Sequence, residues 1–590
     1  MLNELVQEYR SLVERGELDE PGWQRENITF AAVLDQSGNL TDIVDLREEV
    51  ERGKKKVRVP RMIGVPARKK RSSGIAANCL ADNATYVFGL DTKGKPERAI
   101  QCFEAFRTLH VQMFEHLESP VAYAISQFVQ MWDPSAAAQH PVLAPWKAEL
   151  EQGANVLIQV GDTFATEDPM IREQWNHVQE DQSDMPVMQC LITGETGPIA
   201  VTHPNVMGIY GAQSSGAGLV TFNRPAFESY GQDGGQGRNA PVSVSAAFAY
   251  TQALNWLVRS DQHHIRLGEM TIVFWAEEND NAASAFMWQC FSDMDEVSQT
   301  DLKDAMAKLV SGNPVNWAGF PIAPSNHYSI LGISPNAARL SIRFYMRDTL
   351  GHLAENMMRH YSEIQIAHAP FELDVLPLWR LLKETVNQKS KDKNPAPHLA
   401  GDMLRAIMTG QRYPSTFFEQ TEVRLRAESG NVCYGKVANI KAYLMRNGTN
   451  LVQEAREVLT VELNEQSNYP PYVMGRLFAV LEALQRDAHD PSGKSSSEAG
   501  GAKKTTIRDR YFTSACATPA VVFPPLIKLA QAHLKKVDQK KEIYYNRMIT
   551  ELMNKMTANF PVRLSLQDQG IFQMGYYHEV QRRYTKKEDK

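Results

Sequence analysis

Two short segments carry residues that could support catalysis. Gly493-Lys494-Ser495 resembles the end of a phosphate-binding loop, but the leading glycine would have to stand at position 488, which is Ala488, and no strand precedes it. Glu277-Glu278 ends a predicted strand and could hold a metal ion, although adjacent carboxylates at a strand exit are more often solvated. Neither segment comes with a nucleophile, a base and an orienting group, so the sequence predicts no enzyme.

Histidine pairs and cysteines are the other candidate ligands. His263-His264 and His489-Asp490 lack a third ligand at metal-binding spacing, which favours surface polar pairs. The six cysteines are scattered, with no Cys-x-x-Cys pair, so neither a zinc site nor a disulfide framework is indicated. We therefore predict no metal and no cofactor. Residues 1–23 lack the apolar segment of a signal peptide, and no apolar run reaches the roughly 18 residues of a bilayer span, which favours a cytoplasmic protein without a membrane partner.

A basic run indicates a different chemistry, contact with phosphate groups. Residues 52–71, RGKKKVRVPRMIGVPARKKR, contain ten cations and no acid, although the whole chain has a net charge of −6. Charge is also uneven along the chain, because residues 1–473 carry a net charge of −14 and residues 474–590 a net charge of +8. Binding to nucleic acid depends on the local patch and not on the total charge. A solvated face or a targeting signal would give the same pattern.

Hydrophobic spacing and turn residues predict the elements that position these groups. Strands are expected at 84–90, 154–160, 186–194 and 270–278, and helices at 2–13, 99–117 and 244–258. Helical spacing takes over from about residue 375, with bundle helices at 477–484, 524–537, 545–556 and 564–580. The predicted fold is α+β, with a mixed N-terminal half and an all-helical C-terminal region that ends in a small bundle. The predicted domains are 1–375, 376–473 and 474–590, with a flexible loop at 486–506.

Residues 328–346 predict two strands around a turn at Ser334-Pro335-Asn336. In the second strand, alternation predicts an inward face of Leu340, Ile342 and Phe344 and an outward face of Arg339, Ser341 and Arg343. The outward arginines, with Arg347 beyond them, could follow the backbone of a single strand, and a solvated strand face explains them equally well. A Gly-rich loop at 231–237, closed by Arg238 and Asn239, could touch nucleic acid or another subunit.

Several segments together resemble one family. They are RSSGIAANCLADNATYVFGLD (71–91), GRNAPVSVSAAFAYTQALNWLV (237–258), VFWAE (273–277), YSILGISPNAARLSIRFY (328–345), GRLFAVLEALQ (475–485), PLIKLAQAHL (525–534) and LSLQDQGIFQMGYYH (564–578). In this order they resemble the large subunit of type I-C CRISPR surveillance complexes, the Cascade-like effectors. Each string is weak by itself, whereas the ordered set along nearly the whole chain is specific.

The resemblance implies a non-catalytic DNA reader. Such subunits recognise a protospacer-adjacent motif in duplex DNA, promote R-loop formation, hold the displaced strand and help to recruit a helicase-nuclease, while base pairing with the guide RNA reads the target. The implied partners are the target duplex and its displaced strand, the guide RNA complex with its backbone subunits and guide-end subunit, the helicase-nuclease and a small subunit. The family makes that small subunit by internal translation, for which Met474 is the predicted start and Met445 the fallback.

The resemblance also assigns roles to residues of the basic run. Lys69, Lys70 and Arg71 would neutralise phosphates, the turn at Ser72, Ser73 and Gly74 would let the backbone approach the groove, and Asn78 or Asn83 would offer an amide to base edges. Asp82-Asn83 could instead only shape the turn. The further backbone-contact candidates are Lys54, Lys55, Lys56, Arg58, Arg61, Arg238, Asn239, Arg339 and Arg343.

Two other classes of function stay open. One is a metal-dependent nuclease or nucleotide-processing enzyme whose site is dispersed along the chain, with Glu277 as a member. The other is an architectural assembly protein that makes no contact with DNA.

Overall fold

The computed structural model of the chain divides into two compact units. The structure describes residues 1–590 except 53–54, 69–73, 93, 181–184, 223–226, 228–235, 279, 292–295, 392, 397, 429, 490–504, 557–558 and 585–590. The N-terminal unit comprises residues 1–206 and 218–256, and the C-terminal unit comprises residues 207–217 and 257–590. The predicted α+β class is confirmed, because strands and helices mix up to residue 349 and only helices follow in the described residues after it.

The N-terminal unit is built around a mixed five-stranded sheet. The strands of the whole unit are β1 (Trp23–Ile28), β2 (Phe30–Leu34), β3 (Leu40–Asp45), β4 (Glu48–Arg52), β5 (Lys55–Val59), β6 (Arg61–Pro66), β7 (Ala81–Asn83), β8 (Asn155–Val160), β9 (Thr163–Phe164), β10 (Val187–Gln189) and β11 (Thr196–Pro198). The sheet has the order β3-β2-β8-β7, with β9 also paired to β8, and β2 runs parallel to β8. Strands β1 and β6, β4 and β5, and β10 and β11 form three separate antiparallel pairs.

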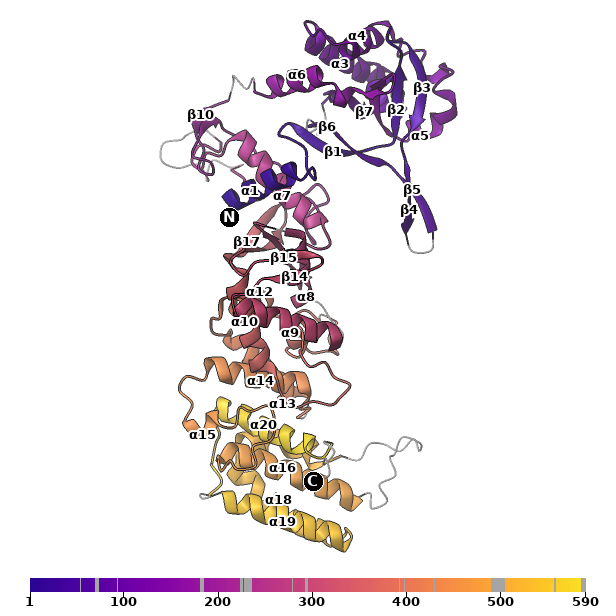
Figure 1. Cartoon of the computed structure of the whole chain (residues 1–590). Coiled ribbons are helices and arrows are strands. Elements are labelled where there is room, and N and C mark those ends of the chain that lie inside the picture. Colours follow the sequence, from indigo (N-terminus) through magenta and orange to yellow (C-terminus); the bar gives the residue numbers. More distant parts are fainter. Residues whose placement is uncertain are drawn as a thin grey trace. The chain divides into compact units, whose positions relative to one another are not determined.

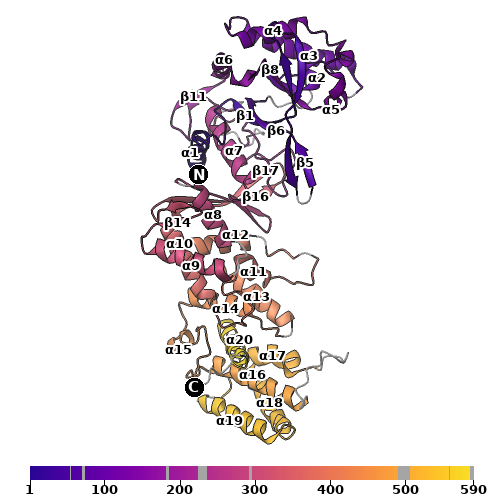
Figure 2. The same cartoon turned by 45° about the vertical axis from the view of Figure 1, so that its right-hand side comes forward.

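The unit also contains helices, several of which pack on this sheet and complete its core. They are α1 (Leu2–Glu14), α2 (Ala84–Val87), α3 (Pro96–Phe114), α4 (Pro120–Met131), α5 (Lys147–Glu151), α6 (Pro169–Glu180) and most of α7 (Val244–Arg259), with 3₁₀ turns at Ala137–Gln139, Ala144–Trp146 and Ala165–Glu167. Helices α3 and α4 lie side by side, and α4 packs on β2 and β8 (Figure 1). Phe30, Phe106 and Phe128 are among the fully buried rings of this core. The β4–β5 hairpin extends away from the sheet in both Figure 1 and Figure 2.

The prediction of a strand at 84–90 is wrong. The residues are rich in strand formers, but Asn83 is the N-cap of helix α2 and its side-chain oxygen accepts the Thr85 amide at 3.1 Å. This bond satisfies an amide that a helix start leaves free, so the local cap overrides the β propensity of the side chains. The expected strand at 186–194 is also short, since β10 covers only Val187–Gln189.

The C-terminal unit begins with an antiparallel sheet of order β12-β13-β16-β17. The strands of this sheet are β12 (His264–Leu267), β13 (Met270–Ala276), β16 (His327–Asn336) and β17 (Arg339–Thr349). The strands β14 (Val315–Trp317) and β15 (Phe320–Ile322) form a separate pair. One sheet face, with Ile272, Phe274, Ile330 and Phe344, joins a core shared with the following helices. That core extends past residue 375 to Tyr577, and a second cluster of buried residues, from Val473 to Tyr576, lies among the helices of the bundle.

The β16–β17 hairpin differs from the prediction in two ways. Ser334-Pro335-Asn336 belongs to β16, and the turn lies at residues 337–338, where Ala337 has φ of +54°. Gly332 pairs with Phe344 but Ile333 pairs with Ile342, so Arg343 is an extra residue, a β-bulge. The bulge exchanges the two faces of the strand, which is why Ile342 is 46% exposed although alternation predicted it inside.

Helices make up the rest of the C-terminal unit. They are α8 (Asp280–Phe291), α9 (Glu296–Val310), α10 (Leu350–Ile364), α11 (Leu378–Lys383), α12 (Leu399–Thr409), α13 (Ser415–Ala427), α14 (Tyr434–Asn447), α15 (Gln453–Arg456), α16 (Pro470–His489), α17 (Ile507–Ala517), α18 (Pro519–Leu534), α19 (Gln539–Lys555) and α20 (Leu566–Gln581). Of the predicted loop 486–506, residues 486–489 are the end of α16, and 490–504 lie outside the described residues. Helix α17 was not predicted; its signal was the capping box of Thr506 and Asp509.

The bundle is held together by a close crossing of α16 and α20. A Cβ added to Gly475 would lie 1.9 Å from the Phe572 carbonyl oxygen, and one added to Gly575 would lie 2.2 Å from the Tyr472 carbonyl oxygen. The two backbones therefore touch where both helices have glycine. Beside this crossing, Arg476 Nε and Glu579 Oε2 form a fully buried ion pair at 3.0 Å.

Candidate nucleic-acid interface

The predicted motif loop is anchored on both sides. Residues 69–73 lie outside the described residues. Before them, the Ala67 amide donates to the Gly22 carbonyl at 2.7 Å, and Arg68 lies 3.5 Å from Glu26. After them, a Cβ on Gly74 would meet no atom within 4 Å, and Ile75 packs against the core. The chain at Gly74 thus borders open space, while the residues on each side of the basic segment are fixed.

A buried carboxylate shapes the segment from Asn78 to Asn83. Asp82 is 1% exposed and accepts hydrogen bonds from the amides of Asn78, at 2.9 Å, and Asn83, at 2.8 Å. Asn78 is only 4% exposed, so in this conformation it does not present its amide to a base. The Asn83 side chain is the helix cap described above, which is the turn-shaping role that the sequence left open for it.

His110 fixes the sharpest bend of the same segment. Leu80 has φ of +61°, a left-handed conformation that is rare for a branched side chain. Its amide donates to His110 Nε2 at 3.0 Å, and His110 Nδ1 lies 2.8 Å from the Phe106 carbonyl oxygen. Since Nε2 accepts, Nδ1 carries the proton and donates. Burial lowers the pKa of His110 to about 4, so the ring is neutral at physiological pH and this bend is preorganised.

Acidic residues on neighbouring strands pair with the described cations of the basic run. Lys56 lies 3.8 Å from Glu49, and Arg61 lies 3.5 Å from Glu48. Arg58 Nη1 donates to Asp45 at 3.2 Å. These pairs are exposed enough to add little stability, but they neutralise part of the positive charge of the hairpin. Lys54 and the side chain of Lys55 lie outside the description.

This pairing was not predicted, although its signal is present in the sequence. The segment DLREEVE, residues 45–51, carries four acids directly before the basic run. Strand pairing of β4 with β5 places Glu49 opposite Arg58 and the backbone of Glu51 opposite that of Lys56, so acidic positions pair with basic positions across the hairpin. Counting charge along the chain hides an arrangement that is set by pairing across strands.

The predicted arginine track does not form one row. The register and the bulge at Arg343 place Arg339 and Arg347 on opposite faces of the sheet. Arg347 donates to Glu277 Oε1 from Nε at 2.9 Å and again from Nη2. Arg343 is exposed and lines a pocket instead. In the N-terminal unit, Arg238 is exposed, and the Asn239 amide donates to the Phe227 carbonyl.

The candidate catalytic residues are engaged in structural contacts. Glu277 binds Arg347 and also lies 3.7 Å from His327 Nδ1. His263 is 1% exposed, which corrects the surface placement expected for it, and its Nδ1 lies 2.7 Å from Ser260 Oγ. His264 Nδ1 lies 2.8 Å from the Ser260 carbonyl oxygen. Among the described residues, no group of three or more His, Cys, Asp or Glu side chains could hold a metal ion.

His489 was expected in a flexible linker, and this placement is wrong. It is the last residue of α16, and its ring lies 5.3 Å from the ring of His533. Asp490 and Gly493-Lys494-Ser495 lie outside the described residues.

Comparison with known proteins decides the family. Residues 5–584 match the family described as "CRISPR-associated protein (Cas_Csd1)". The chain belongs to this family. It is therefore a Cascade large subunit, a component of a complex with other CRISPR-associated subunits and a guide RNA, and the family resemblance found in the sequence is confirmed. No curated protein matches the chain. In the part of the chain that the structure describes, no helix is both long and apolar enough to cross a membrane.

Proposed function

We propose that this chain is the non-catalytic large subunit of a type I-C surveillance complex and that it recognises the protospacer-adjacent motif in the target duplex. The observation that carries the proposal is the family match over nearly the whole chain. A basic segment between two anchored flanks supports it, since such a segment can meet DNA while its flanks hold a defined position. In this proposal the protein reads a few base pairs and the guide RNA reads the rest of the target.

Within the loop, the charged residues and the small residues have different roles. Lys69, Lys70 and Arg71 neutralise phosphates, and the small residues Ser72, Ser73 and Gly74 let the backbone approach the groove. Asn83 remains a candidate for a base contact, in competition with its role as a helix cap. We assign Asn78 to the shape of the loop because it is buried.

Weaker contacts with the DNA backbone come from outside the loop. Lys54–56 and Arg58 on the hairpin and Arg61 at the start of β6 contribute less than their number suggests, because acids on other strands pair with three of them. Arg238 and Arg339 are further candidates. The same subunit would promote R-loop formation, stabilise the displaced strand and help to recruit the helicase-nuclease in the cytoplasm.

We also propose that residues 474–590 are made separately as the small subunit. Met474 begins the part of the chain with a net charge of +8. A chain that starts there keeps Gly475 and Gly575 at the α16–α20 crossing but lacks Tyr472, whose hydroxyl lies 2.8 Å from His578 Nδ1. Intact-mass analysis of the products of the single gene tests this proposal; full-length protein alone would contradict it, and a product from Met445 would move the start.

The absence of catalysis has its own test. Purified chain incubated with labelled DNA and a divalent metal ion should leave the DNA intact. Metal-dependent cleavage that is lost in the Glu277→Gln variant would instead establish the dispersed nuclease site.

The test of DNA recognition uses the assembled complex and duplex DNA across a salt series. Replacing Lys69, Lys70 and Arg71 with Ala should weaken binding to duplexes with and without the motif, and it should flatten the salt dependence by up to about three counterions. A matched control removes three exposed charges elsewhere, at Lys308, Lys389 and Lys391. Equal behaviour of the two triple variants would show that the loop does not contact phosphates.

A further inference from the structure

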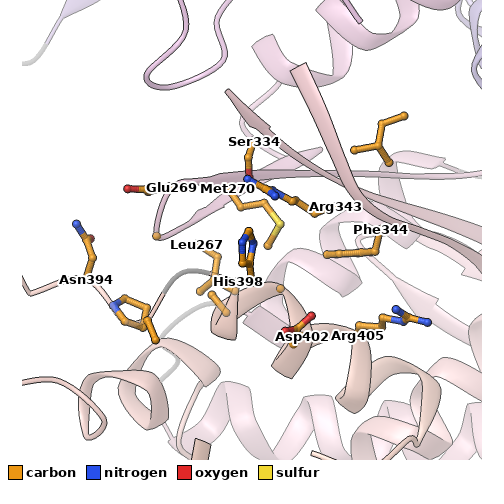
Figure 3. A pocket seen from close by; sticks show the side chains of 16 residues that line it. Leu267, Glu269, Met270, Ser334, Arg343, Phe344, Asn394, His398, Asp402 and Arg405 are labelled. Carbon is orange, nitrogen blue, oxygen red and sulfur yellow. The ribbon is translucent and has the colours of Figure 1, made fainter. Parts of the chain in front are cut away.

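Polar side chains from distant segments also meet away from the candidate interface. At the pocket of about 590 Å³ that Arg343 lines together with α12, Figure 3 shows Arg343 beside Ser334 and Arg405 directed away from the pocket. The two guanidiniums therefore do not converge on one ligand. In the helical bundle, by contrast, the rings of His489 and His533 lie next to each other.

His489 and His533 lie in the last turns of two neighbouring helices. His489 is the last residue of α16, and His533 is the last residue but one of α18. The two helices pack together in the core of the bundle, where the ring centroids of Phe478 and Phe523 are 6.5 Å apart. The negative ends of two helix dipoles therefore lie near the two imidazoles and favour a cation there.

The spacing of the two rings suits two ligands of one tetrahedral metal ion. Their centroids lie 5.3 Å apart, and their planes are inclined by 60°. A zinc–nitrogen bond of about 2.0–2.1 Å places a ring centroid roughly 3.2 Å from the ion, so two imidazoles at the tetrahedral angle have centroids about 5.2 Å apart. A right angle between the ligands, as in octahedral or square-planar coordination, would bring the centroids to about 4.5 Å. The observed separation agrees with the tetrahedral value.

Each ring has a nitrogen that can bind a metal ion. His489 Nδ1 lies 2.9 Å from the Gln485 carbonyl oxygen. Because a carbonyl only accepts, Nδ1 carries the proton and Nε2 keeps its lone pair. Metal-binding histidines commonly have this arrangement, in which a carbonyl fixes the ring nitrogen that does not bind the metal.

His533 is a buried polar group without a partner. It is 6% exposed, and neither of its ring nitrogens has a hydrogen-bond partner within the described ranges. Burial lowers the pKa of His533, and the charges of His489 and Lys536 lower it further, so the ring is neutral at physiological pH. Buried polar groups without partners are rare because they cost stability, and a bond to a metal ion would remove that cost.

The acid closest in sequence to His489 is already engaged. Asp487 Oδ2 accepts a hydrogen bond from the Tyr545 hydroxyl at 2.8 Å and lies 3.5 Å from Lys541 Nζ. Asp487 is therefore not free to act as a third ligand, and the charge of Lys536 opposes a cation. Both facts predict a site that binds more weakly than a zinc site with three or four protein ligands.

We propose that His489 and His533 bind one zinc ion between the ends of α16 and α18. The two imidazoles occupy two of the four tetrahedral positions, and water occupies the others. The ion is an exchangeable clip that holds the two helix ends together. The site does not rest on the proposed function, because neither histidine belongs to the motif loop.

The test is calorimetric titration of the full chain with zinc chloride, in phosphate-free buffer near neutral pH. His489→Gln and His533→Gln should each weaken zinc binding by about tenfold or more, because loss of even an outer-shell partner of a metal ligand costs that much. The double variant should bind no more weakly than either single variant, since the remaining imidazole cannot hold the ion alone. His116→Gln removes an exposed histidine of the N-terminal unit and is the control that should leave the affinity unchanged.

Each outcome decides the proposal. If wild type and His489→Gln bind zinc equally well, the proposal is wrong. If His489→Gln loses the site and a folded His533→Gln variant keeps it, the ion is not shared and the proposal is also wrong. Because His489 is exposed, its substitution should leave the fold intact, so the test stays decisive even if His533→Gln does not fold.

Discussion

Glu422, at the contact between α13 and α20, should make the free energy of unfolding depend on pH. It is 1% exposed, and its Oε2 accepts a hydrogen bond from Gln573 Nε2 at 2.9 Å. Its other oxygen and the side-chain oxygen of Gln573 have no hydrogen-bond partner among the described residues. Burial raises the pKa of Glu422 to about 7, against the smaller opposing effects of the Gln573 hydrogen bond and the Arg426 charge.

The free energy of unfolding depends on pH because Glu422 has a different pKa in the folded and in the unfolded chain. An unfolded glutamate has a pKa of 4.5, so the folded chain holds this proton more tightly than the unfolded chain does. The protonated Glu422 therefore stabilises the folded chain. This stabilisation is complete below pH 4.5 and is lost as pH rises through about 7. At about 1.4 kcal/mol for each pKa unit, the loss between pH 4.5 and pH 8 is roughly 3 kcal/mol.

Urea unfolding at pH 5 and pH 8 measures this loss. Because the chain has two units, the informative quantity is the difference between wild type and Glu422→Gln at each pH, not an absolute free energy. We expect the variant to gain roughly 3 kcal/mol relative to wild type on going from pH 5 to pH 8. Glu419→Gln, on the exposed side of the same helix, is the control, and its free energy of unfolding should differ between pH 5 and pH 8 as much as that of wild type does. Parallel pH profiles for wild type and Glu422→Gln would refute the reasoning.

Substitutions at three other places test separate parts of the structure. Asn83→Ala should lower the free energy of unfolding by about 0.5–2 kcal/mol in urea, and Asn83→Ser should restore most of it because serine also caps helices; a changed motif preference in the serine variant would instead establish base reading. Glu48→Gln with Glu49→Gln should release Lys56 and Arg61 from their ion pairs and steepen the salt dependence of duplex binding by up to about two counterions, and an unchanged slope would mean that these two cations do not meet phosphates. Gly475→Ala should cost about 3 kcal/mol or more in thermal or urea unfolding, because the new Cβ meets backbone and not a movable side chain; wild-type stability would contradict the close crossing.

Much of the fold could be predicted from periodicity. The all-buried strand β13, the strand β8 and helix α7 lie where the sequence placed them, because each carries a long pattern that one element type explains. The short elements were less predictable. Helix α2 depends on one cap at Asn83, and the exposure of Ile342 depends on one inserted residue at Arg343.

The candidate interface was predictable only in part. The basic run was visible in the sequence, but its partial neutralisation depends on how β4 pairs with β5 and how far Arg58 reaches toward Asp45. The burial of Asn78 depends on Asp82, which looked like an ordinary polar residue of a turn. The pocket at Arg343 joins a strand bulge to a helix that starts more than fifty residues later, and no local pattern predicts such a meeting.

The central claim is tested most directly by binding of the assembled complex, with and without this chain, to duplexes that differ only in the base pairs adjacent to the target. The complex that contains the chain should prefer one adjacent motif, and the complex that lacks it should bind a single-stranded target but show no motif preference on duplex DNA. A motif preference that persists without this chain would place recognition in another subunit and contradict the account.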